Sequence, residues 1–99
     1  MILEILQVPG CPGADLLATR LDELLAGRPA SQVIRRVVTS QADAERLGMT
    51  GSPTLLADGA DPFARPGLLP SLSCRLYLDE QGRLGPAPSP GQIRAGLGL

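Results

Sequence analysis

The sequence predicts an α/β fold, an α/β/α sandwich in a single domain that spans residues 1–99. Two observations lead to this prediction. Apolar and β-branched segments typical of strands alternate along the chain with segments whose apolar residues recur at helical spacing. A length of 99 residues suits one domain with one hydrophobic core. The expected order is β-α-β-α-β-β-α, which gives a small, four-stranded mixed sheet.

The first half of the chain supplies a strand, a helix and a second strand. The segment ILEILQV (2–8) is apolar on both faces, as expected of a central strand covered on both sides. Apolar residues follow at helical spacing over 14–25, and Gly27 and Pro29 are expected to end this helix. The segment QVIRRVV (32–38) is β-branched and carries one arginine on each face, which favours a strand at the edge of the sheet.

The second half is expected to add two helices and a pair of strands. A short helix over 40–47 has Ser40 as its cap and Gly48 as its stop. The segment 52–58 is a third strand, and 74–82 alternates as a fourth strand that forms an antiparallel hairpin with it. A last helix begins at Ser89.

Composition excludes several classes of function. The formal net charge is -1 and aromatic residues make up 2% of the chain, so neither a basic surface nor a stacking platform for nucleic acid is expected. The absence of histidine and the presence of only two cysteines predict no metal site and no cofactor. No apolar segment approaches the roughly 18 residues of a membrane span. We therefore expect no membrane partner and a cytoplasmic location, where thiols stay reduced.

The candidate reactive group is Cys11, in the segment VPGCPG between the first strand and the first helix. A helix N-terminus presents unpaired N–H groups and the positive end of the helix dipole, which favour the thiolate. Pro12 fits the first turn, and Gly13 is expected to leave room for a partner sulfur. The alternative is a small residue that merely fits a tight turn.

The position of Cys11, together with GSPT (51–54) before the third strand, resembles the thioredoxin-like superfamily. Nearly the whole chain takes part in the resemblance, which extends to short bacterial proteins called "thioredoxin family", some of them labelled alkylmercury lyase. It implies a cis Ser52–Pro53 bond that faces Cys11. It also implies that the backbone of Ser52 pairs with a substrate, which would be a protein or a low-molecular-weight thiol.

One departure from the superfamily pattern limits the chemistry. Where the C-x-x-C motif has its second cysteine, this chain has Ala14. A monothiol oxidoreductase or redox-responsive protein would then need glutathione, a similar thiol or Cys74 as its resolving partner. Two alternatives stay open: a binding module that kept the scaffold without the chemistry, and a protein that handles soft metals or organomercury. The oligomeric state is also open.

Two further residues carry structural expectations. Cys74 alternates with Leu76 and Leu78, so it is expected to be a buried core thiol. An antiparallel fourth strand would place Cys74 at the end of the sheet far from Cys11, beyond the reach of a disulfide. Phe63 is expected to anchor its loop against the core, with contact to a substrate as the alternative.

Overall fold

The computed structural model describes residues 1–28 and 31–99, so Pro29, which was expected to help end the first helix, lies outside the described residues. The elements follow in the order β1 (Ile2–Gln7), α1 (Pro12–Leu24), β2 (Gln32–Val37), α2 (Gln41–Leu47), β3 (Thr50–Ser52), β4 (Thr54–Ala57), β5 (Ser71–Cys74), β6 (Tyr77–Leu78), β7 (Leu84–Gly85) and α3 (Pro90–Leu97). The predicted α/β class, with three helices and a mixed sheet, is confirmed.

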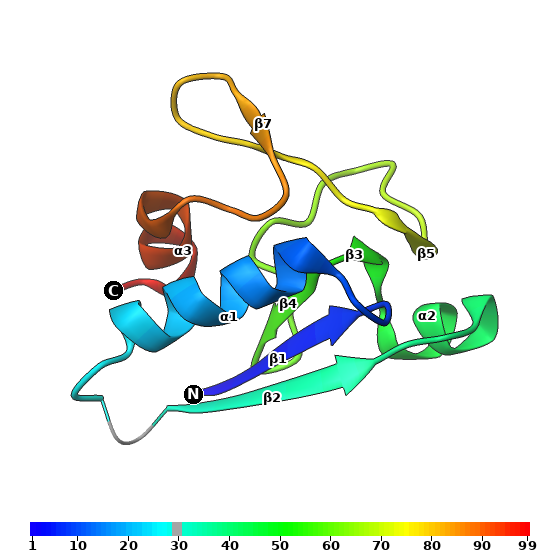
Figure 1. Cartoon of the computed structure of the whole chain (residues 1–99), viewed down its shortest axis with the longest axis horizontal. Helices are drawn as coiled ribbons and strands as arrows, with labels where there is room; N and C mark the ends of the chain where they lie inside the picture. The colour runs from blue at the N-terminus through cyan, green and yellow to red at the C-terminus, as the bar shows by residue number, and fades with distance from the viewer. Residues whose placement is uncertain (29–30) are drawn as a thin grey trace.

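The main sheet has three strands in the order β2-β1-β4 (Figure 1). The central strand β1 pairs in parallel with β2 and antiparallel with β4. The predicted edge position of β2 is confirmed, and its two arginines are paired there. Arg35 contacts Asp15 and Arg36 contacts Glu4, each at 2.6 Å.

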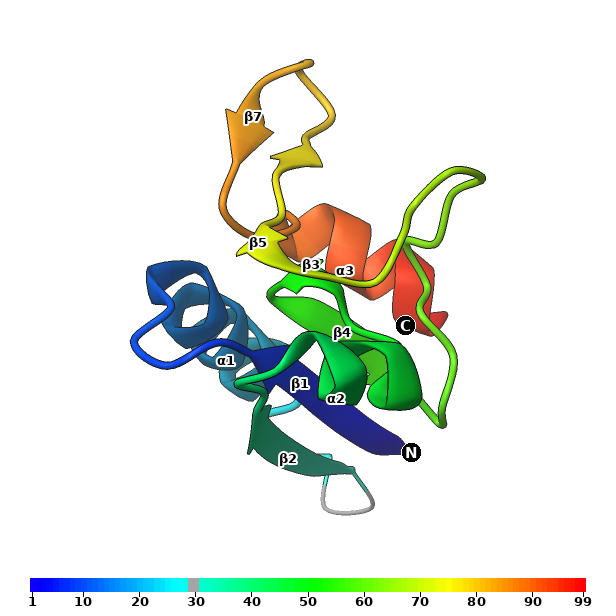
Figure 2. The same ribbon diagram turned by 90° about the vertical axis from the view of Figure 1, so that its right-hand side faces the viewer.

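Helices cover both faces of β1 (Figure 2). On one face, Leu3 and Ile5 pack against residues of α1 and α3, among them Leu17 and Ile93. On the other face, Leu6 packs in a separate cluster with α2. The apolar character of β1 on both sides, which predicted a central strand, therefore corresponds to two separate cores.

Local capping signals define the two shorter helices as predicted. The Ser40 hydroxyl accepts a hydrogen bond from the Asp43 backbone N–H at 3.1 Å, and Gly48 ends α2 in the left-handed conformation. Ser89 forms a capping box with Gln92 at the start of α3. Among the described residues, no helix combines the length and the apolar character needed to span a membrane.

The predicted fourth strand over 74–82 is wrong in its bounds and its direction. β5 ends at Cys74 and runs parallel to β3, while β6 forms a small hairpin with β7. The segment 60–70 carries the chain from the end of β4 back to the start of β3, where the Ser71 N–H donates to the Met49 carbonyl at 3.0 Å. A connection of this length permits parallel pairing, whereas the prediction assumed that the strand after it ran back antiparallel to the third strand.

Candidate functional site

Cys11 is the N-cap residue of α1 and has an extended backbone conformation. Its side chain makes no capping hydrogen bond and is only 7% exposed. The thiol belongs to the apolar cluster that also contains Ala14, Leu17 and Ala87. The predicted place of Cys11 at the start of the helix is confirmed, but the thiol lies beneath the surface.

Pro53 packs against Gly13, which lies in the first turn of α1 two residues after Cys11. The Ser52–Pro53 bond is cis, as the resemblance implied. A Cβ atom added at Gly13 would lie 3.1 Å from Cδ of Pro53 and would overlap the carbonyl oxygen of Pro86. Pro53 and Pro86 therefore fill the space in which a side chain at position 13 would lie.

Ser52 is buried, and its polar groups are used within the chain. Its hydroxyl accepts a hydrogen bond from the Val8 backbone N–H at 3.0 Å, and its carbonyl accepts one from the Arg75 N–H at 2.9 Å. In the parallel pairing of β3 with β5, Ser52 lies opposite Cys74. The chain's own β5 therefore occupies the edge that the resemblance assigned to a substrate. Of the proposed substrate-binding residues, only Pro12 is exposed.

Cys74 is exposed, which corrects the prediction of a buried thiol. The alternation of this segment is inverted: Arg75 and Tyr77 are buried, while Leu76 and Leu78 are 54% and 56% exposed. Both cysteines are free, as expected. The predicted position of Cys74 at the far end of the sheet from Cys11 is wrong, however. Parallel pairing places Cys74 beside Ser52, at the end of β3 that leads into Pro53.

A buried polar cluster around Arg75, which was not predicted from the sequence, explains this inversion. The Arg75 guanidinium donates to a carboxylate oxygen of Asp61 at 2.8 Å, to the Phe63 carbonyl at 2.9 Å and to the Thr50 hydroxyl at 3.1 Å. It also lies 4.8 Å from the centre of the Tyr77 ring. A buried arginine is tolerated only when its charge and its N–H groups are satisfied in this way.

Tyr77 connects this cluster to the neighbourhood of Cys11. Its hydroxyl donates to the Pro53 carbonyl at 2.5 Å, and its ring meets Phe63 edge to face with centroids 5.8 Å apart. Phe63 is partly buried against the core, so its predicted role as a loop anchor is confirmed. The sequence does place Arg75 and Tyr77 on one face of an alternating segment. Because an arginine was expected to face solvent, that face was predicted to be exposed, whereas it is the buried one.

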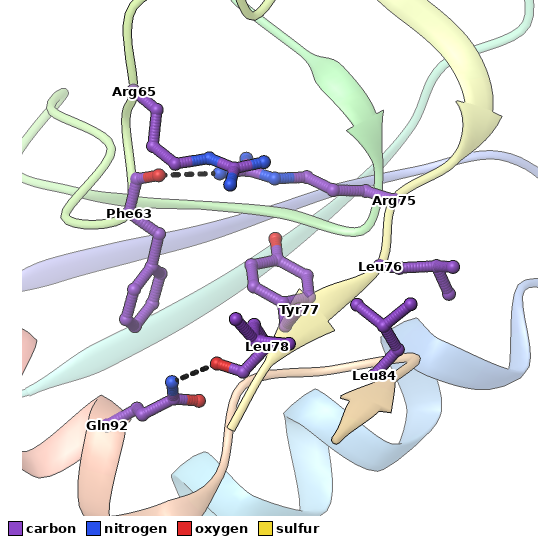
Figure 3. A pocket seen from close by; sticks show the side chains of 8 residues that line it. All are labelled: Phe63, Arg65, Arg75, Leu76, Tyr77, Leu78, Leu84 and Gln92. Carbon is purple, nitrogen blue, oxygen red and sulfur yellow. Dashed lines mark hydrogen bonds between the residues drawn. The ribbon is translucent and has the colours of Figure 1, made fainter. Parts of the chain in front are cut away.

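The ring of Tyr77 also lines a cavity of about 350 Å³. Figure 3 shows its lining residues, which are Phe63, Arg65, Arg75, Leu76, Tyr77, Leu78, Leu84 and Gln92. None of them was a predicted site residue. The cavity and the Cys11 neighbourhood thus share Tyr77, whose hydroxyl bonds to Pro53 while its ring faces the cavity.

Tyr77 is expected to resist titration in the folded chain. Burial raises its pKa well above the ordinary value of about 10, against the lowering effect of Arg75; the charges of Asp61 and Cys11 raise it further. The folded chain keeps this proton where the unfolded chain loses it. The free energy of unfolding therefore keeps its full value below about pH 10. Above that pH, ionisation of this phenol in the unfolded chain lowers it by up to about 1.4 kcal/mol per pH unit.

The measurement is direct, because Tyr77 is the chain's only tyrosine. Tyrosinate absorbance should rise near pH 10 in concentrated urea but not under native conditions. The free energy of unfolding of Tyr77→Phe should fall less steeply above pH 10 than that of the parent, because the variant has no phenol to ionise on unfolding. A native titration that coincides with the unfolded one would contradict the expectation.

No protein-family model, curated protein or solved structure matches this chain. In the part of the chain that the structure describes, no three His, Cys, Asp or Glu side chains come together as a set of metal ligands.

Proposed function

We propose that this chain is a thioredoxin-like domain with a thiol function at Cys11, acting in the cytoplasm as a monothiol oxidoreductase or redox-responsive protein. The observation that carries the proposal is the packing of Pro53 against Gly13 in the first turn of α1, which Cys11 caps. The arrangement of β1 between a parallel β2 and an antiparallel β4, with α1 between β1 and β2, supports the topology.

The proposed reaction is the formation of a mixed disulfide. The Cys11 thiolate attacks one sulfur of glutathione disulfide or of a protein disulfide, the S–S bond breaks, and the second sulfur leaves as a thiolate that takes up a proton. Cys11 becomes oxidised, and the departing thiol is reduced. The free N–H groups in the first turn of α1 stabilise the attacking anion. With Ala14 in place of a second cysteine, an external thiol releases the product.

A non-enzymatic binding module is the second candidate. Two observations favour it: Cys11 is buried in an apolar cluster, and β5 occupies the edge beside Ser52. A substrate backbone could pair with Ser52 only after β5 had moved away. The two candidates differ in what they require of the Cys11 sulfur, so its reactivity decides between them.

The test compares two single-cysteine variants by their rates of iodoacetamide alkylation at neutral pH. Cys74→Ser keeps Cys11, and we expect it to react faster than a free cysteine peptide and to form a mixed disulfide with glutathione disulfide. The matched control Cys11→Ser keeps the exposed Cys74 and should react at the peptide's rate. Both variants should react alike when unfolded.

The contrary outcome is equally specific. If folded Cys74→Ser reacts no faster than the peptide and takes up no glutathione, the thiol proposal fails. The binding module then becomes the better account of the chain.

A further inference from the structure

We infer that the 350 Å³ cavity binds a small carboxylate with an apolar tail, of the kind a medium-chain fatty acid presents. Its volume lies within the range of small-molecule sites in proteins. The inference uses none of the chemistry proposed for Cys11 and holds whether or not that thiol reacts. Charge, hydrogen bonding and apolar surface in the cavity each point to this class of ligand.

The charge of the lining is unbalanced. Arg75 is neutralised by Asp61, with an N–O distance of 2.8 Å. Arg65 is exposed and has no ion pair among residues 1–28 and 31–99. Arg65 and Arg75 line the same cavity, and in Figure 3 their side chains reach toward it from different segments of the chain. Two arginines in one lining, with a carboxylate paired to only one of them, leave an excess positive charge at the cavity. A planar guanidinium binds a carboxylate through two parallel hydrogen bonds.

Two further polar groups of the lining, the Gln92 amide and the Phe63 carbonyl, are already bonded within the chain. Gln92 donates from Nε2 to the Leu78 carbonyl at 2.5 Å, and its Oε1 accepts from the Ser89 N–H at 2.9 Å. The Phe63 carbonyl accepts from Arg75. The cavity therefore suits a ligand with one anionic end rather than one with many hydroxyl or amide groups, whose own partners would be missing.

The remainder of the lining is apolar and unusually exposed. Leu76, Leu78 and Leu84 are 54%, 56% and 66% exposed, and they surround a single cavity. The Tyr77 and Phe63 rings add to the same lining. Exposed apolar residues gathered at one hollow are typical of a ligand site, and covering them stabilises a complex in proportion to the area removed from water. An apolar tail supplies that cover.

The test titrates the whole chain with octanoate and follows leucine methyl and Tyr77 ring signals by NMR. We expect saturable shifts at Leu76, Leu78 and Leu84, while the core residue Leu3 stays unchanged. Acetate lacks the tail and octylammonium lacks the negative charge. Both should bind at least about tenfold more weakly than octanoate, a difference of about 1.4 kcal/mol or more.

Two variants locate the charge that recognises the carboxylate. Arg65→Gln should weaken octanoate binding at least about tenfold. Arg83→Gln is the matched control, because Arg83 is also exposed but lies outside the lining of the cavity, and it should bind as the parent does. Both substitutions are at exposed side chains, and unfolding curves will confirm that the variants are folded.

Three outcomes would overturn the inference. Equal binding of octanoate and octylammonium would show that the arginines do not favour a negatively charged ligand. Equal weakening by both arginine variants would show only a general effect of net charge. Leucine shifts that follow protein concentration without octanoate would show that a second copy of the chain covers this surface.

Discussion

Replacing Arg75 by methionine is expected to lower the free energy of unfolding by about 3–5 kcal/mol, because the substitution leaves a carboxylate without its counter-charge. The side chains of Arg75 and Asp61 are only 6% and 13% exposed and lie 2.8 Å apart. Water cannot replace the lost guanidinium at such a site. The Phe63 carbonyl loses a hydrogen bond in the same step. Urea unfolding at neutral pH measures the effect.

An exposed ion pair provides the control. Arg36 and Glu4 lie closer together, at 2.6 Å, but their side chains are 49% and 22% exposed. Arg36→Met should therefore cost less than about 1 kcal/mol, since solvent screens the pair. The double variant Arg75→Met with Asp61→Asn should regain much of the loss, because no buried charge is then left unpaired. Equal costs for the Arg75 and Arg36 variants would contradict this account.

The parts of the fold that were predicted correctly depend on local signals. Ser40 and Ser89 cap helices through hydrogen bonds to residues three positions ahead, so short segments are enough to locate α2 and α3. The apolar faces of β1 and the arginines of β2 likewise identify a central strand and an edge strand. Each of these features is decided within a few residues of the signal.

The interpretation failed where a distant partner decides the structure. In the segment from Cys74 to Leu78, alternation alone places the leucines inside and the arginine outside. Asp61 lies 14 residues from Arg75 and reverses that choice, because it neutralises the guanidinium in the interior. The strand is also interrupted at Arg75 and Leu76, so no continuous ladder enforces an alternating pattern.

The candidate site was predicted in part for the same reason. Cys11 lies at a strand-to-helix junction that can be recognised from its own neighbours. The burial of Ser52 and Gly13 comes instead from β5 and from Pro86, which arrive much later in the chain. The cavity is likewise assembled from two loops, a hairpin and a helix. These segments come together only when the chain packs, so no short stretch of the sequence predicts the cavity.

Gly13→Ala is expected to destabilise the chain by about 1–3 kcal/mol, although alanine is the better helix former by about 1 kcal/mol. The new methyl group would overlap the Pro86 carbonyl oxygen, a backbone atom, and crowd Cδ of Pro53 at 3.1 Å. The segment that holds Pro86 cannot withdraw freely. Pro88 is fully buried, and its carbonyl accepts a hydrogen bond from Nη1 of Arg20 at 2.7 Å.

A second glycine in the same local setting separates the clash from helix propensity. Gly91 follows Pro90 in the first turn of α3 as Gly13 follows Pro12 in α1. A Cβ atom at Gly91 would come too close only to the carboxylate end of Glu80, and the Ser89 hydroxyl would lie at an ordinary contact distance of 3.9 Å. Glu80 is an exposed side chain that can move aside at the cost of its hydrogen bond with Ser89. Gly91→Ala should therefore change the free energy of unfolding by less than about 1 kcal/mol in either direction. If urea unfolding finds Gly13→Ala as stable as Gly91→Ala, then Pro86 does not press on the start of α1, and Cys11 is less enclosed than its position implies.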